Sequence, residues 1–220
     1  MSFNHTKYIA IQEFIDKNSL NYPKIVAVSK NHPMDSVEEA ILKGVTIFGE
    51  NRVQEALEKF SSIKKNNPVI ELHLTGPLQT NKVKTALSIF DVFQTLDREK
   101  LALQFYKFPE LIINKFFFIQ VNTGKEKTKS GLYPEKVDEF IKFCKFDLNI
   151  SVIGLMCIPP KNEDPKEHFD LLANIANRNN LQHLSMGMSD DYKSAILCGA
   201  TYVRIGTKFF GSRKWKQILQ

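Results

Sequence analysis

The sequence is poor in the residue types that mark several common classes of protein. It contains only three cysteines and five histidines among 220 residues. The cysteines, at positions 144, 157 and 198, are odd in number and widely spaced, so they make neither a disulfide framework nor a metal-binding motif. We therefore expect no metal site and a location in the reducing cytoplasm.

Long apolar runs are missing as well. No stretch approaches the roughly 18 apolar residues of a membrane span, and residues 1–16 lack the apolar core of a secretory signal. No linker rich in Pro, Gly or Ser divides the chain, and no internal repeat is visible. We expect residues 1–220 to form a single domain that does not enter a membrane.

Positive charge is in excess, yet arginine is scarce. The formal net charge is +6, and 25 of the 30 basic residues are lysines that are spread along the chain. Aromatic residues do not alternate with them, and no nucleic-acid-binding motif is present. We interpret the charge as a solvated surface and expect no nucleic-acid partner.

Eight short apolar segments, by contrast, recur along the whole chain. Continuous apolar runs of this kind are typical of parallel strands that are covered on both faces. The expected strands are Lys24–Ser29, Val45–Phe48, Ile70–Thr75, Val92–Leu96, Phe116–Val121, Val152–Cys157, Leu181–Ser185 and Tyr202–Ile205.

Helix-like segments separate these strands, and one more precedes them at Tyr8–Lys17. The others are Asp35–Gly44, Asn51–Lys65, Asn81–Phe90, Asp97–Phe108, Pro134–Lys145, Asp164–Asn179 and Asp190–Gly199. Eight βα units predict an α/β fold, a (β/α)8 TIM barrel with an extra N-terminal helix. An open doubly wound sheet is the alternative.

Chemically capable residues gather where the expected strands end. Lys30 follows the first strand, and Arg204 lies within the last one. In a barrel these strands are neighbours, and their carboxyl ends open on the face that carries function. A lysine amine that loses its proton on burial can attack an aldehyde, and a permanently charged arginine can donate to a pyridine nitrogen. The alternatives are a solvated Lys30 and an Arg204 paired with Asp190 or Glu50.

The last two strand ends also suggest a phosphate site. Ser189 precedes an expected helix, and Gly206-Thr207 follows the last strand, at the two loops where barrels often bind phosphate. Ser189 is read equally well as a plain helix N-cap, and Gly206-Thr207 as a tight turn. An amine, an arginine and a phosphate cradle together point to pyridoxal 5′-phosphate (PLP).

Further side chains lie in or directly after the neighbouring expected strands. Asn51, after the second strand, can donate to the hydroxyl of such a cofactor or act as an N-cap. His73, inside the third strand, is interpreted as a satisfied core histidine, and Met156 and Cys157 as core residues.

Long ordered motifs connect these residues to a known family. They include Ala27-Val28-Ser29-Lys30, Phe48-Gly49-Glu50-Asn51, His73-Leu74-Thr75-Gly76-Pro77-Leu78-Gln79, Leu184-Ser185-Met186-Gly187-Met188-Ser189-Asp190-Asp191 and Val203-Arg204-Ile205-Gly206-Thr207. The chain resembles the pyridoxal phosphate homeostasis proteins from about residue 24 to residue 213. The resemblance implies a barrel like the N-terminal domain of alanine racemase.

The same resemblance implies a Schiff base at Lys30, a ring-nitrogen contact from Arg204, and phosphate held around Ser185, Ser189, Gly206 and Thr207. It also implies a cofactor-binding protein for vitamin B6 homeostasis, with PLP-dependent apoenzymes as candidate recipients. One departure is Asn31-His32, where Thr-Lys often follows the lysine.

The sequence favours a monomeric carrier over an enzyme. A racemase of the alanine type needs a second base from a C-terminal domain, and the nine residues after Gly211 leave no room for one. An arginine at the ring nitrogen also makes the cofactor a poor electron sink. Two alternatives remain, a weak amino-acid racemase and an aldolase whose Lys30 attacks a phosphorylated sugar.

Overall fold

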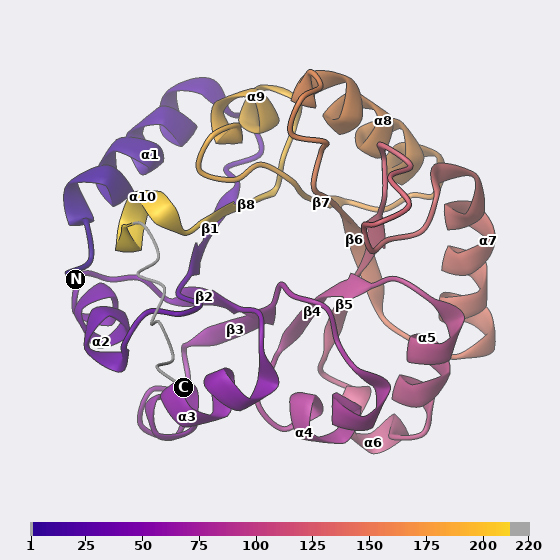
Figure 1. Ribbon diagram of the computed structural model, residues 1–220, viewed down its shortest axis with the longest axis horizontal. Coiled ribbons are helices and arrows are strands. Elements are labelled where there is room, and N and C mark those ends of the chain that lie inside the picture. Colours follow the sequence, from indigo (N-terminus) through magenta and orange to yellow (C-terminus); the bar gives the residue numbers. More distant parts are fainter. Residues whose placement is uncertain (1, 212–220) are drawn as a thin grey trace, which may run out of the picture.

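The computed structural model describes residues 2–211 of the chain. Eight parallel strands form a closed barrel in which each strand pairs with the next and β8 pairs with β1 (Figure 1). The predicted TIM barrel is confirmed, and the open sheet is wrong. The strands are β1 Lys24–Val28, β2 Ile47–Glu50, β3 Glu71–Leu74, β4 Val92–Leu96, β5 Phe116–Val121, β6 Val152–Cys157, β7 His183–Ser185 and β8 Tyr202–Ile205.

Helices surround this barrel on its outside (Figure 1). The α-helices are α1 His5–Asn18, α2 Met34–Leu42, α3 Val53–Asn66, α4 Val83–Leu87, α5 Glu99–Tyr106, α6 Pro109–Ile112, α7 Val137–Lys142, α8 Pro165–Arg178, α9 Tyr192–Leu197 and α10 Thr207–Phe210. Short 3₁₀ segments lie at Thr80–Lys82 and Pro134–Lys136, and a π-helical turn at Phe143–Asp147. Within residues 2–211 no helix is both long and apolar enough to cross a bilayer.

The extra N-terminal helix α1 is present and begins three residues earlier than expected. The Asn4 side chain caps it by accepting a hydrogen bond from the Lys7 amide at 3.0 Å. Phe3 packs against the rings of Phe209 and Phe210, each with a centroid separation of 5.6 Å. The segment before α1 is therefore joined to α10 at the end of the chain's last βα unit.

Two strands begin two residues later than the apolar pattern predicts, because the preceding helices use the first apolar residue. Gly44 has a φ of +86°, and the Val45 amide then donates to the Ala40 carbonyl, which closes the end of α2. Asn180, with a φ of +53°, lets Leu181 close α8 on Ala176 in the same way. Val45 and Leu181 therefore belong to helix caps, and their strands start two residues later.

Most of the apolar core lies between the barrel and its helices. Phe93 and Phe117 on neighbouring strands stack at 5.2 Å, and each packs edge-on against Phe105 of α5 at 4.9 Å. A smaller apolar cluster fills the barrel interior around Val26, Phe118 and Met156. Both faces of the strands are buried, which explains why the strands are continuous apolar runs.

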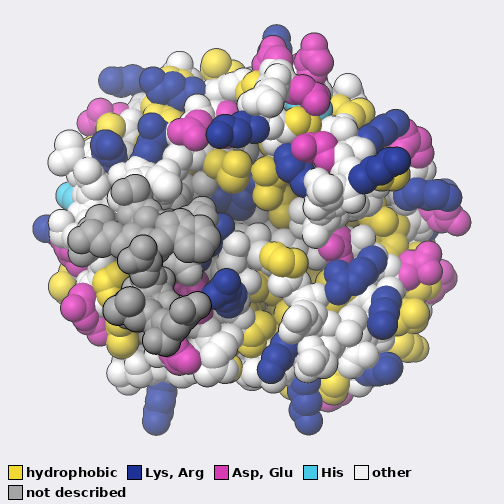
Figure 2. Space-filling model, in the orientation of Figure 1, with side chains coloured by type: hydrophobic (Ala, Val, Ile, Leu, Met, Phe, Trp, Pro, Cys, Tyr) yellow, Lys and Arg dark blue, Asp and Glu magenta, His cyan; other side chains and the backbone are white. Residues whose placement is uncertain are grey.

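The parallel order brings all strand carboxyl ends to one face of the barrel. β1 and β8 pair in register from Lys24 opposite Tyr202 to Ala27 opposite Ile205. Lys30 and Gly206 thus follow neighbouring strand ends. On the face shown in Figure 2, Lys and Arg side chains are spread from the edge to the middle among Asp and Glu, without a single basic patch.

Residues 212–220, on which the expected absence of a second domain rests, lie outside the described part of the chain.

Candidate functional site

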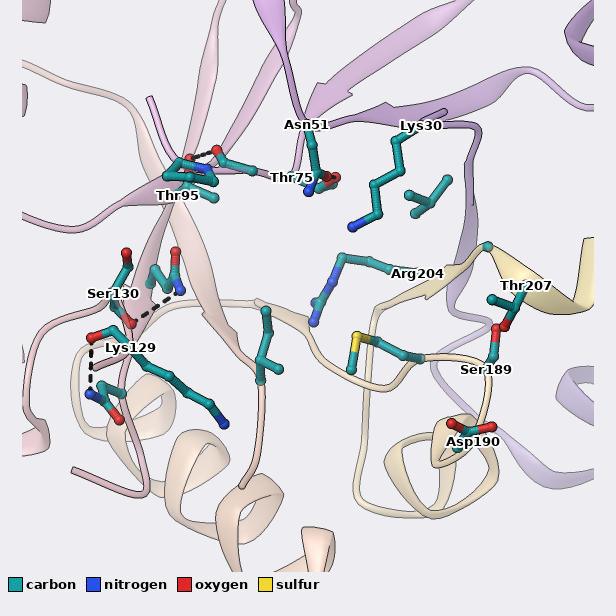
Figure 3. Close-up of a pocket in the computed structure, with 18 of the residues that line it drawn as sticks. Lys30, Asn51, Thr75, Thr95, Lys129, Ser130, Ser189, Asp190, Arg204 and Thr207 are labelled. Atoms are coloured by element: carbon teal, nitrogen blue, oxygen red, sulfur yellow. Dashed lines mark hydrogen bonds between the residues drawn. The ribbon is translucent and has the colours of Figure 1, made fainter. Parts of the chain in front are cut away.

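A cavity of about 480 Å³ lies at the carboxyl ends of the strands. Six of the seven residues predicted to bind the cofactor line it: Lys30, Asn51, Ser189, Arg204, Gly206 and Thr207. Lys30 and Arg204 extend into it from neighbouring parts of the barrel (Figure 3). The fold thus brings together the predicted residues that lie in or after β1, β2, β7 and β8.

A buried lysine of α3 holds the backbone of the loop that carries Lys30. Lys59 of α3 donates to the carbonyls of Ser29, at 2.8 Å, and His32, at 3.2 Å. Asn31 adopts a φ of +62°, and its amide donates to the Glu55 carboxylate. Lys30 is therefore presented by a turn with its backbone fixed on both sides.

Lys59 belongs to a buried charged cluster that was not predicted from the sequence. It lies 2.6 Å from the Glu50 carboxylate, which also accepts from the Ser29 hydroxyl at 2.7 Å. Burial is the main influence on Glu50 and raises its pKa to about 7, although Lys59 acts in the opposite direction. A signal was available: Lys59 lies on the same helix face as the buried residues Ala56, Phe60 and Ile63.

Arg204 is buried, with 5% of its surface exposed. Its Nη1 donates to the Ser185 hydroxyl at 2.7 Å, and its Nη2 donates to the Cys157 carbonyl at 2.8 Å. The ion pair considered as an alternative is wrong, because Glu50 pairs with Lys59 and Asp190 forms no ion pair with Arg204 among residues 2–211. Neutral acceptors thus hold the guanidinium, and it faces the cavity.

Ser185 is the one predicted cofactor-binding residue that does not line the cavity. Its hydroxyl donates to Gln94 Oε1 at 2.6 Å and accepts from Arg204. The side chain is fully buried behind Arg204. The hydroxyl is therefore used in supporting the guanidinium, and its expected phosphate contact stays a prediction.

Ser189 and Thr207 lie together at one side of the cavity (Figure 3), and Gly206, which directly precedes Thr207, also lines it. Ser189 does not cap α9, as the sequence had suggested, since that helix begins at Tyr192 after an Asp191 cap. The Ser189 hydroxyl instead accepts from the Lys208 amide at 3.4 Å, which joins the loops after β7 and β8. Thr207 opens α10, where helix geometry leaves amide groups without partners in the helix.

Asn51 lies on the wall beside Lys30 (Figure 3). Its Oδ1 accepts from the Thr75 hydroxyl at 2.9 Å, so its NH₂ group remains as a donor at the cavity wall. Asn51 is not the N-cap of α3, since Arg52 holds that position. Gly76 packs against Asn51, and a Cβ there would lie 2.6 Å from the Asn51 carbonyl oxygen.

Further polar residues, which were not predicted from the sequence, line the opposite wall. Thr95, Gln120, Asn122, Lys129 and Ser130 lie there. Gln120 and Asn122 pin the loop that follows β5 by donating to the carbonyls of Ser130 and Glu126, at 3.2 and 2.8 Å. The sequence signal was that Gln120 lies near the end of the expected strand Phe116–Val121 and Asn122 directly follows it, but the loop fold was not apparent.

Comparisons with known proteins show which family this chain is similar to. The model of the alanine racemase N-terminal domain family matches residues 11–214. A pyridoxal phosphate homeostasis protein of Aquifex aeolicus is 40% identical, with 89% of each chain covered. One of Pasteurella multocida is 38% identical, with 88% of each covered.

This chain belongs to the pyridoxal phosphate homeostasis protein family.

Solved structures place the family on this barrel. PipY of Synechococcus elongatus with PLP bound superposes with a TM-score of 0.81 at 30% identity, covering 94% of this chain and 100% of that one. Alanine racemase of Acinetobacter baumannii gives a TM-score of 0.72 at 17% identity, covering 93% of this chain and 61% of that one. The likeness to alanine racemase shows only that this chain has the same barrel fold.

Proposed function

We propose that this protein binds PLP in the cavity through a Schiff base on Lys30 and serves intracellular PLP homeostasis. The observation that carries the proposal is that the Lys30 amine and the Arg204 guanidinium line the same cavity. Support also comes from the homeostasis proteins named among its relatives and from the PLP-bound structure of PipY.

The cavity provides a matching group for each part of the cofactor. Lys30 would join the aldehyde with loss of one water, and the Asn51 NH₂ group would donate to the ring hydroxyl. Arg204 would donate to the ring nitrogen. Ser189, Gly206 and Thr207 would hold the phosphate through a hydroxyl and backbone amides.

We further propose that the protein has little or no catalytic turnover. PLP supplies an electrophilic carbon and an electron-withdrawing ring, which withdraws best when its nitrogen is protonated. Arg204 can only donate, so it leaves that nitrogen without a proton. A monomeric cytoplasmic carrier that delivers PLP to apoenzymes fits these properties.

Reduction of the loaded protein tests the covalent link. Wild-type protein with PLP is expected to show a visible absorption band, and borohydride should place a stable label on Lys30, located by peptide mass spectrometry. Lys30→Ala should lose the band, whereas Lys129→Ala, which removes the other lysine of the cavity, should keep it. A band and label that persist without Lys30 would reject the assignment.

Proton exchange tests the absence of turnover. The loaded protein is incubated with individual amino acids in deuterated water, and α-proton exchange is followed by NMR. We expect rates no higher than those of free PLP. Faster exchange that depends on Lys30 would establish the racemase alternative, and a protein that takes up no PLP would favour the aldolase.

A further inference from the structure

Five side chains form a continuous hydrogen-bonded chain through the barrel interior. Arg204 Nη1 lies 2.7 Å from Ser185 Oγ, and Ser185 Oγ lies 2.6 Å from Gln94 Oε1. Gln94 Nε2 lies 2.7 Å from His73 Nδ1, and His73 Nε2 lies 2.6 Å from Glu71 Oε1. The chain links β8, β7, β4 and β3, and leads from the cavity to the opposite end of the barrel.

The donor and acceptor at every link follow from the arginine. A guanidinium only donates, so Ser185 accepts from it and donates its own proton to the Gln94 oxygen. The Gln94 NH₂ then faces His73 Nδ1, which must accept. His73 therefore carries its proton on Nε2 and donates it to Glu71. All four bonds run in one direction, from a cation to a carboxylate.

The chain is shielded from water over most of its length. His73, Gln94 and Ser185 are 0% exposed, and Arg204 is 5% exposed. Only Glu71, at the first residue of β3, reaches partial exposure. Aligned hydrogen bonds polarise one another in such surroundings, so a charge at one end is felt at the other.

The two ends complement each other electrostatically. Arg204 forms no ion pair within residues 2–211. Glu71 is held ionised, because the hydrogen bond from His73 is the largest influence lowering its pKa. Burial lowers the pKa of His73, which is consistent with a neutral ring inside the chain.

We propose that Glu71 is a remote positioning residue for Arg204, acting through His73, Gln94 and Ser185 to hold the guanidinium toward the PLP ring nitrogen. The proposal rests on the proposed function, since it assumes that the ring nitrogen meets Arg204. Glu71 is the anionic end of this series of hydrogen bonds, and Arg204, the proposed contact of the cofactor, is its cationic end. Its removal loosens Arg204 without touching the cavity wall.

Histidine NMR on protein free of PLP tests the direction of the hydrogen bonds between Arg204 and Glu71. With ¹⁵N-labelled histidine, His73 should show a protonated Nε2 and an unprotonated Nδ1. The opposite tautomer, or a doubly protonated ring, would overturn the proposed direction of the bonds. This measurement does not depend on cofactor binding.

PLP titration tests whether a change at Glu71 affects Arg204 through the hydrogen-bonded side chains. Glu71→Gln keeps an acceptor for His73 and removes the charge, so the protein should fold, and its PLP affinity should fall roughly three- to tenfold. Ser185→Ala cuts the chain next to Arg204 and should weaken binding at least as much. Asp147→Asn removes an exposed carboxylate from the same end of the barrel as Glu71 and should leave binding unchanged.

The double variant Glu71→Gln/Ser185→Ala decides the mechanism. If Glu71 acts through Ser185, the double variant should bind PLP no more weakly than Ser185→Ala alone. Losses that multiply, or an unchanged affinity in Glu71→Gln, would overturn the proposal. If wild-type protein binds no PLP at all, the proposed function fails instead, while the His73 tautomer still reports on the chain.

Discussion

At the scale of single residues, the buried pair Lys59–Glu50 determines how Lys30 is presented. Lys59 holds the carbonyls of Ser29 and His32 on either side of Lys30, and it pairs with Glu50 at 2.6 Å and with Glu55 at 2.8 Å. A buried charge without its partner is strongly destabilising. The geometry of the proposed cofactor-binding lysine thus depends on two ionisable groups that do not line the cavity.

The shifted pKa of Glu50 predicts how stability depends on pH. Its pKa rises from 4.5 to about 7 on folding, mainly because the carboxyl is buried. The folded state then binds more protons than the unfolded state between these values, so this contribution to the free energy of unfolding declines as pH rises from 4.5 to about 7.

Urea unfolding across that pH range provides the measurement. Glu50→Gln is expected to remove this decline. The difference in free energy of unfolding between wild type and variant should therefore change with pH between 4.5 and about 7. A difference that is constant between pH 4.5 and 7 would contradict the raised pKa.

At the scale of elements, left-handed residues between helices and strands decide where the strands begin and where loops enter the cavity. Gly44 and Asn180 end α2 and α8 and delay β2 and β7. Gly187 has a φ of +87° in the loop that leads from β7 to Ser189. A Cβ at Gly187 would lie 2.5 Å from the Ala195 side chain, so this loop packs directly on α9.

Gly187→Ala is expected to be more damaging than an equivalent change elsewhere. Gly44 has nearly the same φ, but a Cβ there would meet nothing within 4 Å. Gly44→Ala should cost about 1–2 kcal/mol from the backbone conformation alone. Gly187→Ala should cost more and should also weaken PLP binding, because the loop carrying Ser189 must shift. Equal losses of unfolding free energy in the two variants would show that the contact with α9 is unimportant.

At the scale of the whole molecule, the apolar layer between barrel and helices supplies stability, and the strand ends supply chemistry. The rings of Phe93, Phe105 and Phe117 lie in that layer. None of them lines the cavity. Stability and cofactor binding can therefore be changed separately.

Phe93→Ala is expected to lower the free energy of unfolding by about 3–5 kcal/mol. Phe146→Ala serves as its control, because Phe146 is 80% exposed and its loss should cost less than about 0.5 kcal/mol. Denaturant unfolding measures both. PLP affinity at low temperature, where Phe93→Ala is still folded, should equal that of wild type, and a loss there would argue against the separation.

The sequence by itself determined the order of the eight strands and of the main helices between them, and it placed most of the proposed cofactor-binding groups at the strand ends, whereas the short helices α6 and α10 were not predicted. Apolar runs, helix ends and polar strand ends are local patterns, and parallel strands bring their carboxyl ends to one face whatever their register. Lys30, Asn51 and Thr207 could be placed at the cavity for that reason.

The tertiary structure alone decided which groups meet inside the barrel. Ser185 could not be assigned to Arg204 and Gln94 from the sequence, because that contact depends on strand register and on how the barrel closes. Lys59 was counted among the solvated lysines, and it is buried because α3 packs the face that carries it against the barrel. Contacts between residues far apart in the chain are set by packing, and only the folded barrel joins Glu71 to Arg204.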